Sequence, residues 1–305
     1  MSVEISPINN GSTLLSIYIV DAFTDVPFSG NPAAVCLVLP GQNITAKEMQ
    51  KIGNEMNLSE TAFVFLEKGD FQSANTFGLR WFTPTTEVDL CGHATLAASA
   101  VLFREKGNDC DKISFSTRSG ELTVSRSEQN RIALNFPLNP PTPQILDDIK
   151  GLLKTCLKDL TIIQDVQLSA TGKLLLRLKD CTTRNELEEM KPLVKDMVNA
   201  ESSGLVKGVG LTIKGSPDNG CVDNKGQVYD FISRYFAPWL GIEEDPVTGA
   251  WHTVAAAYWA KELNKTSLYA RQCSSRGGDL WLTVQDQRLI LSGDAVINMR
   301  GTFIL

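Results

Sequence analysis

Two short turns, far apart in a sequence of 305 residues, carry the residue types that a proton-transfer site needs. The first is Cys91-Gly92-His93, and the second runs from Asp245 to Ala250. Each leads through a glycine, Gly92 or Gly249, into an alanine-rich apolar run, which predicts a helix that is buried on all sides. The free N–H groups at the start of such a helix attract a carboxylate or a phosphate. The turns therefore indicate a duplicated lobe with a ligand between the copies, although two unrelated core helices that begin with glycine would look the same.

Glu60 is the candidate general base. It stands where a predicted helix gives way to the apolar run Thr61 to Leu66. A carboxylate at such a boundary can be partly desolvated, which raises its pKa toward the range that acid–base catalysis uses. A solvated glutamate at the start of a strand is the alternative that the spacing leaves open.

The imidazole of His93 and the thiol of Cys91 offer two further kinds of chemistry. His93 could donate to a bound carboxylate or shuttle a proton, or it could be a packed histidine that a backbone carbonyl satisfies. At the start of a helix, the dipole would favour the thiolate of Cys91. A racemase with two thiols needs a second cysteine opposite the first, and the downstream turn, Val247 to Ala250, has none.

Asp245-Pro246 predicts the start of the second buried helix, with aspartate as the N-cap and proline as the first helical residue. The alternative is that the carboxylate of Asp245 faces the ligand and receives an ammonium or a hydroxyl group. Local spacing does not decide between these two roles. His252, inside the second helix, is interpreted as a core residue or as a support for the site.

Composition and charge narrow the possible classes of function. The net charge of −6 gives no reason to expect nucleic acid or an anionic membrane as a partner. No apolar run is long enough to span a bilayer, and residues 1–12 lack the pattern of a secretory signal, so a cytoplasmic protein is expected. Seven cysteines without a CxxC pair and two histidines without an HxxxH motif predict neither a disulfide framework nor a metal site. Glycine-rich nucleotide motifs are missing, so no cofactor is expected.

The elements that must position these residues are mostly strands. Many strands with one enclosed helix in each half predict an α+β fold of curled, mostly antiparallel sheets. A capping box at Thr45 and Glu48 predicts the start of a further helix. A second capping box, at Thr183 and Glu186, predicts a helix that is expected to run to Val194.

A run of prolines between residues 137 and 143 predicts the boundary between two lobes. The first lobe is expected to span residues 1–138 and the second residues 139–305. The final strand, about 295–305, is a candidate to return to the first lobe. Sequence alone does not settle where that strand lies.

Five motifs occur in order along nearly the whole chain and resemble those of the PhzF-like family, the phenazine biosynthesis-like isomerases, and most of all its animal members. The motifs are Asp21-Ala22-Phe23-Thr24, Gly30 to Val35, Asn57-Leu58-Ser59-Glu60-Thr61, Cys91-Gly92-His93-Ala94-Thr95 and Glu244 to Gly249. The resemblance implies two similar lobes, each a curled sheet around a central helix, as in diaminopimelate epimerase. It also implies an active site without a cofactor in the cleft between the lobes, and usually a homodimer.

By the same resemblance, Glu60 would move a proton between carbons of a small carboxylate-bearing substrate. The polar groups of the substrate would be bound by His93, Gly92, Asp245, Gly249 and Ala250. Family members commonly have serine at the position of Ala250, so this chain lacks a hydroxyl that would form a hydrogen bond worth about 0.5–1.5 kcal/mol. The departure leaves open a module that binds a small ligand or a protein without catalysis. A racemase based on Cys91 is a further alternative.

Overall fold

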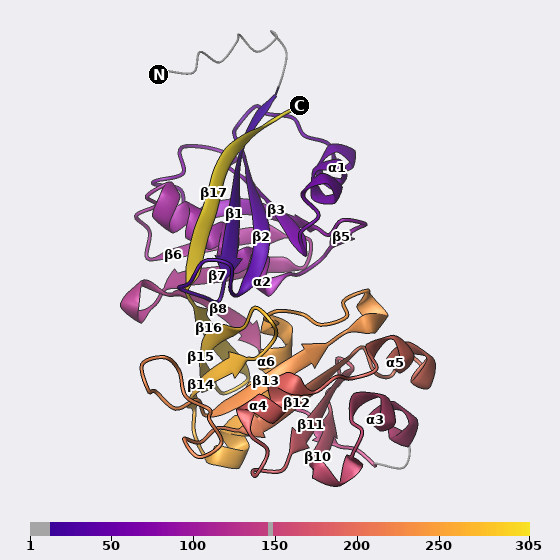
Figure 1. Ribbon diagram of the computed structural model, residues 1–305. Coiled ribbons are helices and arrows are strands. Elements are labelled where there is room, and N and C mark those ends of the chain that lie inside the picture. The colour runs from indigo at the N-terminus through magenta and orange to yellow at the C-terminus, as the bar shows by residue number, and fades with distance from the viewer. Residues whose placement is uncertain (1–12, 146–148) are drawn as a thin grey trace, which may run out of the picture.

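Two helices enclosed by strands form the centres of two lobes in the computed structural model, which describes residues 13–145 and 149–305 (Figure 1). Residues 1–12, considered above as a possible signal, lie outside the described residues. Helix α2 (Gly92–Ala100) is buried from His93 to its end, and α6 (Gly249–Leu263) is buried at most of its positions. Neither helix has a polar face, so each is stable only inside a sheet that curls around it. The predicted α+β fold with two similar lobes is confirmed.

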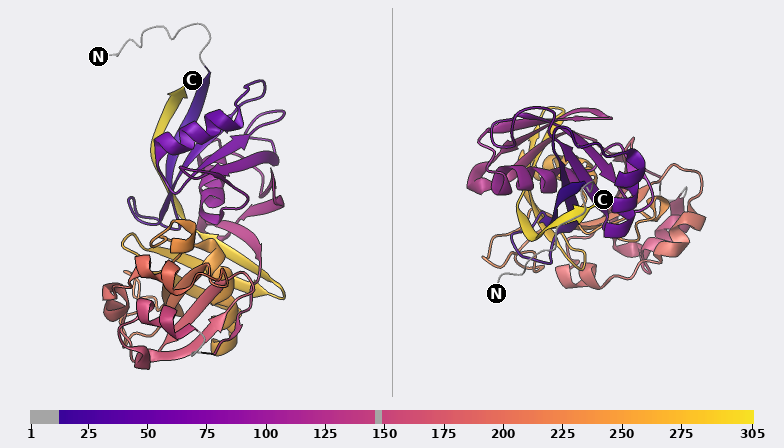
Figure 2. Two further views of the ribbon diagram at one scale, coloured as in Figure 1. Left: turned by 90° about the vertical axis from the view of Figure 1, so that its right-hand side faces the viewer. Right: turned by 90° about the horizontal axis from the view of Figure 1, so that it is seen from above.

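The strands of the first lobe surround α2. They are β1 (Leu14–Ala22), β2 (Asn31–Val38), β3 (Glu60–Phe65), β4 (Thr76–Phe82), β5 (Glu87–Val88), β6 (Lys112–Thr117), β7 (Gly120–Arg126) and β8 (Ile132–Pro137). The last strand of the chain, β17 (Ala295–Ile304), pairs antiparallel with β1 along its whole length. Figure 2 shows β17 running beside β1 to the far end of this lobe.

The second lobe repeats this plan around α6. Its strands are β9 (Thr142–Pro143), β10 (Ile163–Leu168), β11 (Lys173–Leu178), β12 (Gly208–Lys214), β13 (Phe231–Phe236), β14 (Ser267–Gln272), β15 (Gly278–Gln285) and β16 (Arg288–Gly293). Each central helix follows one strand of a parallel pair and precedes the other: β4 and β6 for α2, β13 and β14 for α6. Most other pairings are antiparallel, and the antiparallel pair of β8 and β16 joins the two lobes.

The remaining α-helices are short. They are α1 (Ala46–Met56), α3 (Lys150–Cys156), α4 (Arg184–Glu189) and α5 (Val194–Ala200). Both predicted capping boxes are present, at the starts of α1 and α4. The expected continuation of the second helix to Val194 is wrong, because α4 ends at Glu189 and α5 begins only after Pro192. A proline disfavours the helical conformation of the residue before it, which explains the break.

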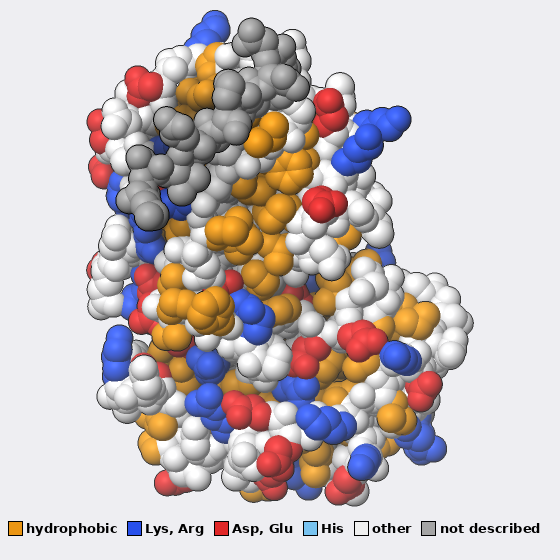
Figure 3. All heavy atoms as spheres, turned by 45° about the horizontal axis from the view of Figure 1, so that its top comes forward, with side chains coloured by type: hydrophobic (Ala, Val, Ile, Leu, Met, Phe, Trp, Pro, Cys, Tyr) orange, Lys and Arg blue, Asp and Glu red, His pale blue; other side chains and the backbone are white. Residues whose placement is uncertain are grey.

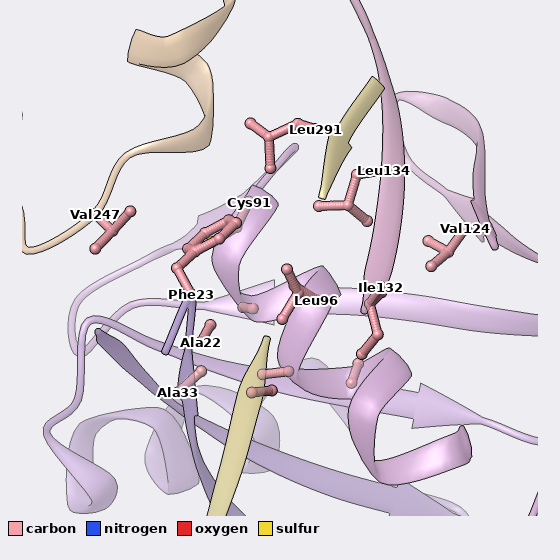
Figure 4. Close-up of a cluster of buried hydrophobic side chains, with 14 of the residues drawn as sticks. Ala22, Phe23, Ala33, Cys91, Leu96, Val124, Ile132, Leu134, Val247 and Leu291 are labelled. Carbon is pink, nitrogen blue, oxygen red and sulfur yellow. The ribbon is translucent and has the colours of Figure 1, made fainter. Parts of the chain in front are cut away.

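One apolar core runs through both lobes. Phe23 and Leu134 of the first lobe belong to the same buried cluster as Val247 and Leu291 of the second (Figure 4). A Cβ atom added to Gly293 would lie 2.5 Å from the ring of Phe23, so only glycine fits beside Phe23 in this core.

The surface and the helices each add one observation. On the face shown in Figure 3, side chains of both charge signs are interspersed, and apolar side chains gather toward the upper lobe. Among the described helices, none combines the length and the apolar character that crossing a membrane requires.

Candidate active site

Glu60 and His93 meet at the edge of the first lobe that faces the second. Glu60 is the first residue of β3, and His93 lies in the first turn of α2. The Nε2 atom of His93 lies 3.0 Å from Oε2 of Glu60, and the side chains are only 7% and 12% exposed. On the other side of the ring, Sγ of Cys91 lies 3.4 Å from Nδ1 of His93. A carboxylate, an imidazole and a thiol therefore form one buried row.

The charges of this row depend on one another. Burial would raise the pKa of Glu60, but the neighbouring His93 lowers it below its usual value, so the raised pKa expected from the sequence is wrong. Burial would lower the pKa of His93, but the neighbouring Cys91 and Glu60 hold it well above its usual value. The pair is thus a carboxylate beside an imidazolium. Burial raises the pKa of Cys91, and the charge of Glu60 adds to this, so the expected dipole-favoured thiolate is wrong.

The starts of the two central helices meet at the same place. A Cβ atom added to Gly92 would lie 3.7 Å from Cα of Gly249, so the first turns of α2 and α6 touch. The N-cap residues Cys91 and Thr248 form no capping hydrogen bond through their side chains. Two positive helix ends without side-chain caps, pointing at one spot, favour the binding of a carboxylate there.

Asp245 is not the N-cap of the second helix, which corrects the helix start predicted from Asp245-Pro246. Helix α6 begins at Gly249 with Thr248 as its N-cap. The carboxylate of Asp245 instead accepts hydrogen bonds from Nδ2 of Asn31 at 2.8 Å and from Oγ1 of Thr248 at 2.6 Å. The carboxylate of Asp245 is therefore bonded by Asn31, from a distant part of the chain, and does not cap the helix. Burial raises the pKa of Asp245 to about 6, although His93 and the hydroxyl of Thr248 offset part of this.

Asn31 is a residue of the site that sequence analysis did not single out. It is fully buried, and its Nδ2 also donates to the backbone oxygen of Val247 at 2.9 Å. Its Oδ1 has no hydrogen-bond partner among the described residues. Asn31 lies within the Gly30 to Val35 motif, which the sequence analysis named only as part of the family resemblance.

The loop around Arg276 contains none of the predicted site residues. In the structure it joins the lobes. The guanidinium of Arg276 donates to the carboxylate of Asp21 at 2.7 Å and to the backbone oxygen of Gly30 at 2.8 Å. The N–H of Gly30 donates to the backbone oxygen of Gly277 at 2.7 Å. This seam holds the first lobe against the second beside Asn31.

Ala250 and the two residues after it point in different directions. Ala250 is exposed, whereas Trp251 is fully buried and donates from Nε1 to the hydroxyl of Ser233 at 3.0 Å. The bulky indole therefore lies in the core of the second lobe and does not fill the site. His252 is also fully buried, and burial lowers its pKa to about 4, in agreement with its interpretation as a core residue or a support.

A large cavity lies away from this cluster. It has a volume of about 860 Å³ and is lined by the 23–29 loop of the first lobe and the 222–229 segment of the second, but by none of the six predicted site residues. The buried cluster is preferred as the site because it brings a carboxylate, an imidazole and a thiol with shifted pKa values together at the start of α2, beside the start of α6. Within the described residues, Glu60, Cys91 and His93 also each present one metal-ligating atom, all within 4.8 Å of one another.

Comparison with known proteins gives these residues a context. The family model described as phenazine biosynthesis-like protein (PhzC-PhzF) matches residues 20–301. A phenazine biosynthesis-like domain-containing protein of Bos taurus is 47% identical, covering 94% of this chain and 98% of its own. A Pseudomonas aeruginosa protein named as an uncharacterized isomerase is 40% identical, covering 95% of this chain and 99% of its own.

Solved structures agree with this context. The crystal structure of a phenazine biosynthesis PhzC/PhzF protein from Clostridium difficile is similar with a TM-score of 0.79 and 37% identity, covering 95% of this chain and 99% of that one. A hydroxyproline epimerase from Agrobacterium vitis, with a TM-score of 0.52 and 10% identity over 96% of this chain and 93% of that one, shares the fold alone.

Proposed function

The chain belongs to the phenazine biosynthesis-like (PhzC-PhzF) family, and we propose that it is a cofactor-independent isomerase. It moves a proton between two carbons of a small carboxylate-bearing substrate that is held between the two lobes. The first lobe is residues 1–138 with the returning strand β17, and the second lobe begins at residue 139. The isomerase name of the Pseudomonas aeruginosa relative supports the reaction class.

The observation that carries the proposal is the buried pair of Glu60 and His93. Neither Oε2 of Glu60 nor Nε2 of His93 forms an aligned hydrogen bond with a described residue, although the two atoms are 3.0 Å apart. Buried polar atoms without an aligned hydrogen bond are costly, and such atoms are typical of sites that complete their bonding with a ligand.

In the proposed reaction, the carboxylate of Glu60 takes a proton from one carbon of the substrate. The C–H bond breaks, its electron pair enters the conjugated system of the substrate, and an O–H bond forms on Glu60. The imidazolium of His93 then faces the developing negative charge in a site that excludes water. Glu60 then delivers a proton to a second carbon. While Glu60 carries the proton, exchange with solvent lets deuterium from D2O enter the product. Positioned acid–base catalysis of this kind contributes about 10²–10⁴-fold.

The remaining site residues are proposed to bind the substrate. The helix starts at Gly92 and Gly249, with the backbone N–H of Ala250, hold the substrate carboxylate. Asp245, whose pKa of about 6 leaves it partly protonated near neutral pH, receives an amino or hydroxyl group. Because Glu60 and His93 are buried, the lobes must part for the substrate to enter.

One specific residue, Ala250, supports a non-catalytic alternative. Ala250 lacks the hydroxyl that family members commonly offer, which favours a module that binds a small ligand or a protein without turnover. A racemase based on Cys91 has less support, because burial keeps that thiol protonated and the helix start opposite it has no cysteine.

A screen separates these proposals. Small carboxylates are tested for a rise in melting temperature, and each hit is incubated with the protein in D2O and followed by NMR. Deuterium entering a carbon position of the hit supports the isomerase. Binding without any exchange supports the non-catalytic module.

A further inference from the structure

Three different kinds of metal-ligating group meet at the start of α2. They are the thiol of Cys91, the imidazole of His93 and the carboxylate of Glu60, with one donor atom of each within 4.8 Å of the others. Sγ lies 3.4 Å from Nδ1 of His93, and Oε2 of Glu60 lies 3.0 Å from Nε2. One ion binds only one nitrogen of an imidazole, so one of these two contacts must rearrange when the ion binds. The ligand atoms of a tetrahedral zinc site, each about 2.0–2.3 Å from the metal, lie about 3.3–3.8 Å apart. Side-chain rotations that draw the three donor atoms together from within 4.8 Å would bring three ligands around one ion.

The cluster also offers atoms that a cation would satisfy. Oε2 of Glu60 and Nε2 of His93 lack an aligned hydrogen bond to any part of the chain that the structure describes. The His93 side chain is more than nine-tenths buried, so bulk water does not replace the missing partner. Deeply buried polar atoms without partners favour a bound group that completes their bonding.

We propose that Glu60, Cys91 and His93 form a binding site for a thiophilic divalent cation of the Zn²⁺ type. The thiolate and the imidazole select such an ion over Mg²⁺ or Ca²⁺, which prefer sites made only of oxygen. Three protein ligands leave a fourth position for water. The bound ion occupies the carboxylate of Glu60 and therefore inhibits proton transfer. That inhibitory clause rests on the proposed function, whereas the binding itself does not.

Cobalt(II) is the probe that tests binding, because a thiolate–cobalt bond absorbs in the near ultraviolet and four-coordinate Co²⁺ absorbs strongly in the visible. Cys110 and Cys181, the cysteines that are not buried, are first replaced by serine to remove adventitious thiols. This double variant is expected to bind one Co²⁺ per chain with both sets of bands, and a chelator is expected to abolish them.

In the same background, Cys91→Ser is expected to lose the near-ultraviolet band. Glu60→Gln and His93→Gln are expected to weaken Co²⁺ affinity by about tenfold or more, because even residues that only support metal ligands contribute about 10–100-fold. The matched control is Cys156→Ser, which changes a buried cysteine of the second lobe and should keep both bands. Melting curves with and without Co²⁺ show whether each variant is folded.

Two results overturn the binding proposal: a thiolate band that survives Cys91→Ser, or no band in the folded double variant at millimolar Co²⁺. If Co²⁺ binds through Cys91 but leaves isotope exchange in D2O unchanged, the inhibitory clause is wrong. If no substrate ever shows exchange, the proposed function fails, while the spectroscopic result still decides the metal site.

Discussion

Asn31 and Asp245 lie 214 positions apart in the chain and share a buried hydrogen bond of 2.8 Å across the junction of the two lobes. Asn31 is the first residue of β2, and Asp245 precedes α6 by a short turn. The bond ties the strand beside Glu60 to the start of the second central helix, because β2 and β3 are parallel neighbours with Ala33 opposite Glu60. The amide of Asn31 therefore links the two halves of the candidate site.

Asn31→Ala should destabilise the protein by about 1–3 kcal/mol, because it leaves a buried carboxylate with one donor fewer. The free energy of unfolding from urea titration measures the effect. The matched control is Asn54→Ala, which removes an exposed amide that bonds the backbone of Pro84 and should change stability by less than about 0.5 kcal/mol. Equal effects of the two substitutions would show that Asn31 has no special role.

The burial of Asp245 predicts a pH dependence of stability. Its pKa is raised from 3.8 to about 6, mainly by desolvation, so the folded state holds a proton that the unfolded state releases. The stabilisation from this proton is complete below about pH 4 and is lost as the pH rises through about 6, a change of about 3 kcal/mol at most. Asp245→Asn should remove this dependence.

Urea unfolding of the parent and of Asp245→Asn between about pH 4 and about pH 7 measures the difference. The variant should gain stability relative to the parent as the pH rises. A difference that stays constant over this range would mean that the carboxylate of Asp245 keeps an ordinary pKa.

Arg276→Lys should loosen the seam between the lobes. The lysine keeps the charge, but it cannot reproduce the fork that binds both Asp21 and the backbone oxygen of Gly30. Asp21 is only 1% exposed, so the loss should cost about 1–3 kcal/mol of unfolding free energy. Arg118→Lys, at a side chain that is 57% exposed, is the control and should be nearly neutral. If Arg276→Lys leaves the free energy of unfolding unchanged, the contacts of Arg276 do not stabilise the junction of the lobes.

Ala250→Ser tests the departure from the family pattern. The added hydroxyl should strengthen binding of a carboxylate-bearing ligand by about 0.5–1.5 kcal/mol, or roughly two- to twelvefold in Kd. Isothermal titration with a hit from the thermal screen measures this, with Ala260→Ser, farther along the same helix, as the control. Unchanged binding by Ala250→Ser would place the ligand away from this helix start.

The central helices could be predicted from sequence because their composition leaves no polar face, and burial is then the only stable outcome. The start of the second helix was predicted wrongly for the opposite reason. Asp245-Pro246 is a good local capping signal, but the carboxylate is bonded by Asn31, which no local pattern reveals. The local capping preference of Asp245 is overridden by its hydrogen bond with Asn31, which is distant in the chain.

Only part of the row of Cys91, His93 and Glu60 could be predicted from the sequence. Cys91 and His93 are near neighbours, but Glu60 reaches them through the pairing of β2 with β3 and the packing of α2 against both strands. The spacing of cysteines and histidines alone therefore predicted no metal-ligating cluster. The position of Glu60 next to His93 had support only from the family resemblance.

The most direct test of the account compares Glu60→Gln with the parent in D2O, using a small carboxylate that binds. The account predicts that the rate of deuterium exchange at carbon falls by about 10²–10⁴-fold while the Kd changes by less than about threefold. Glu67→Gln, an exposed glutamate just beyond the same strand, is the matched control and should exchange at the parent rate. A folded Glu60→Gln that exchanges as fast as the parent would contradict the assignment of Glu60 as the group that moves the proton.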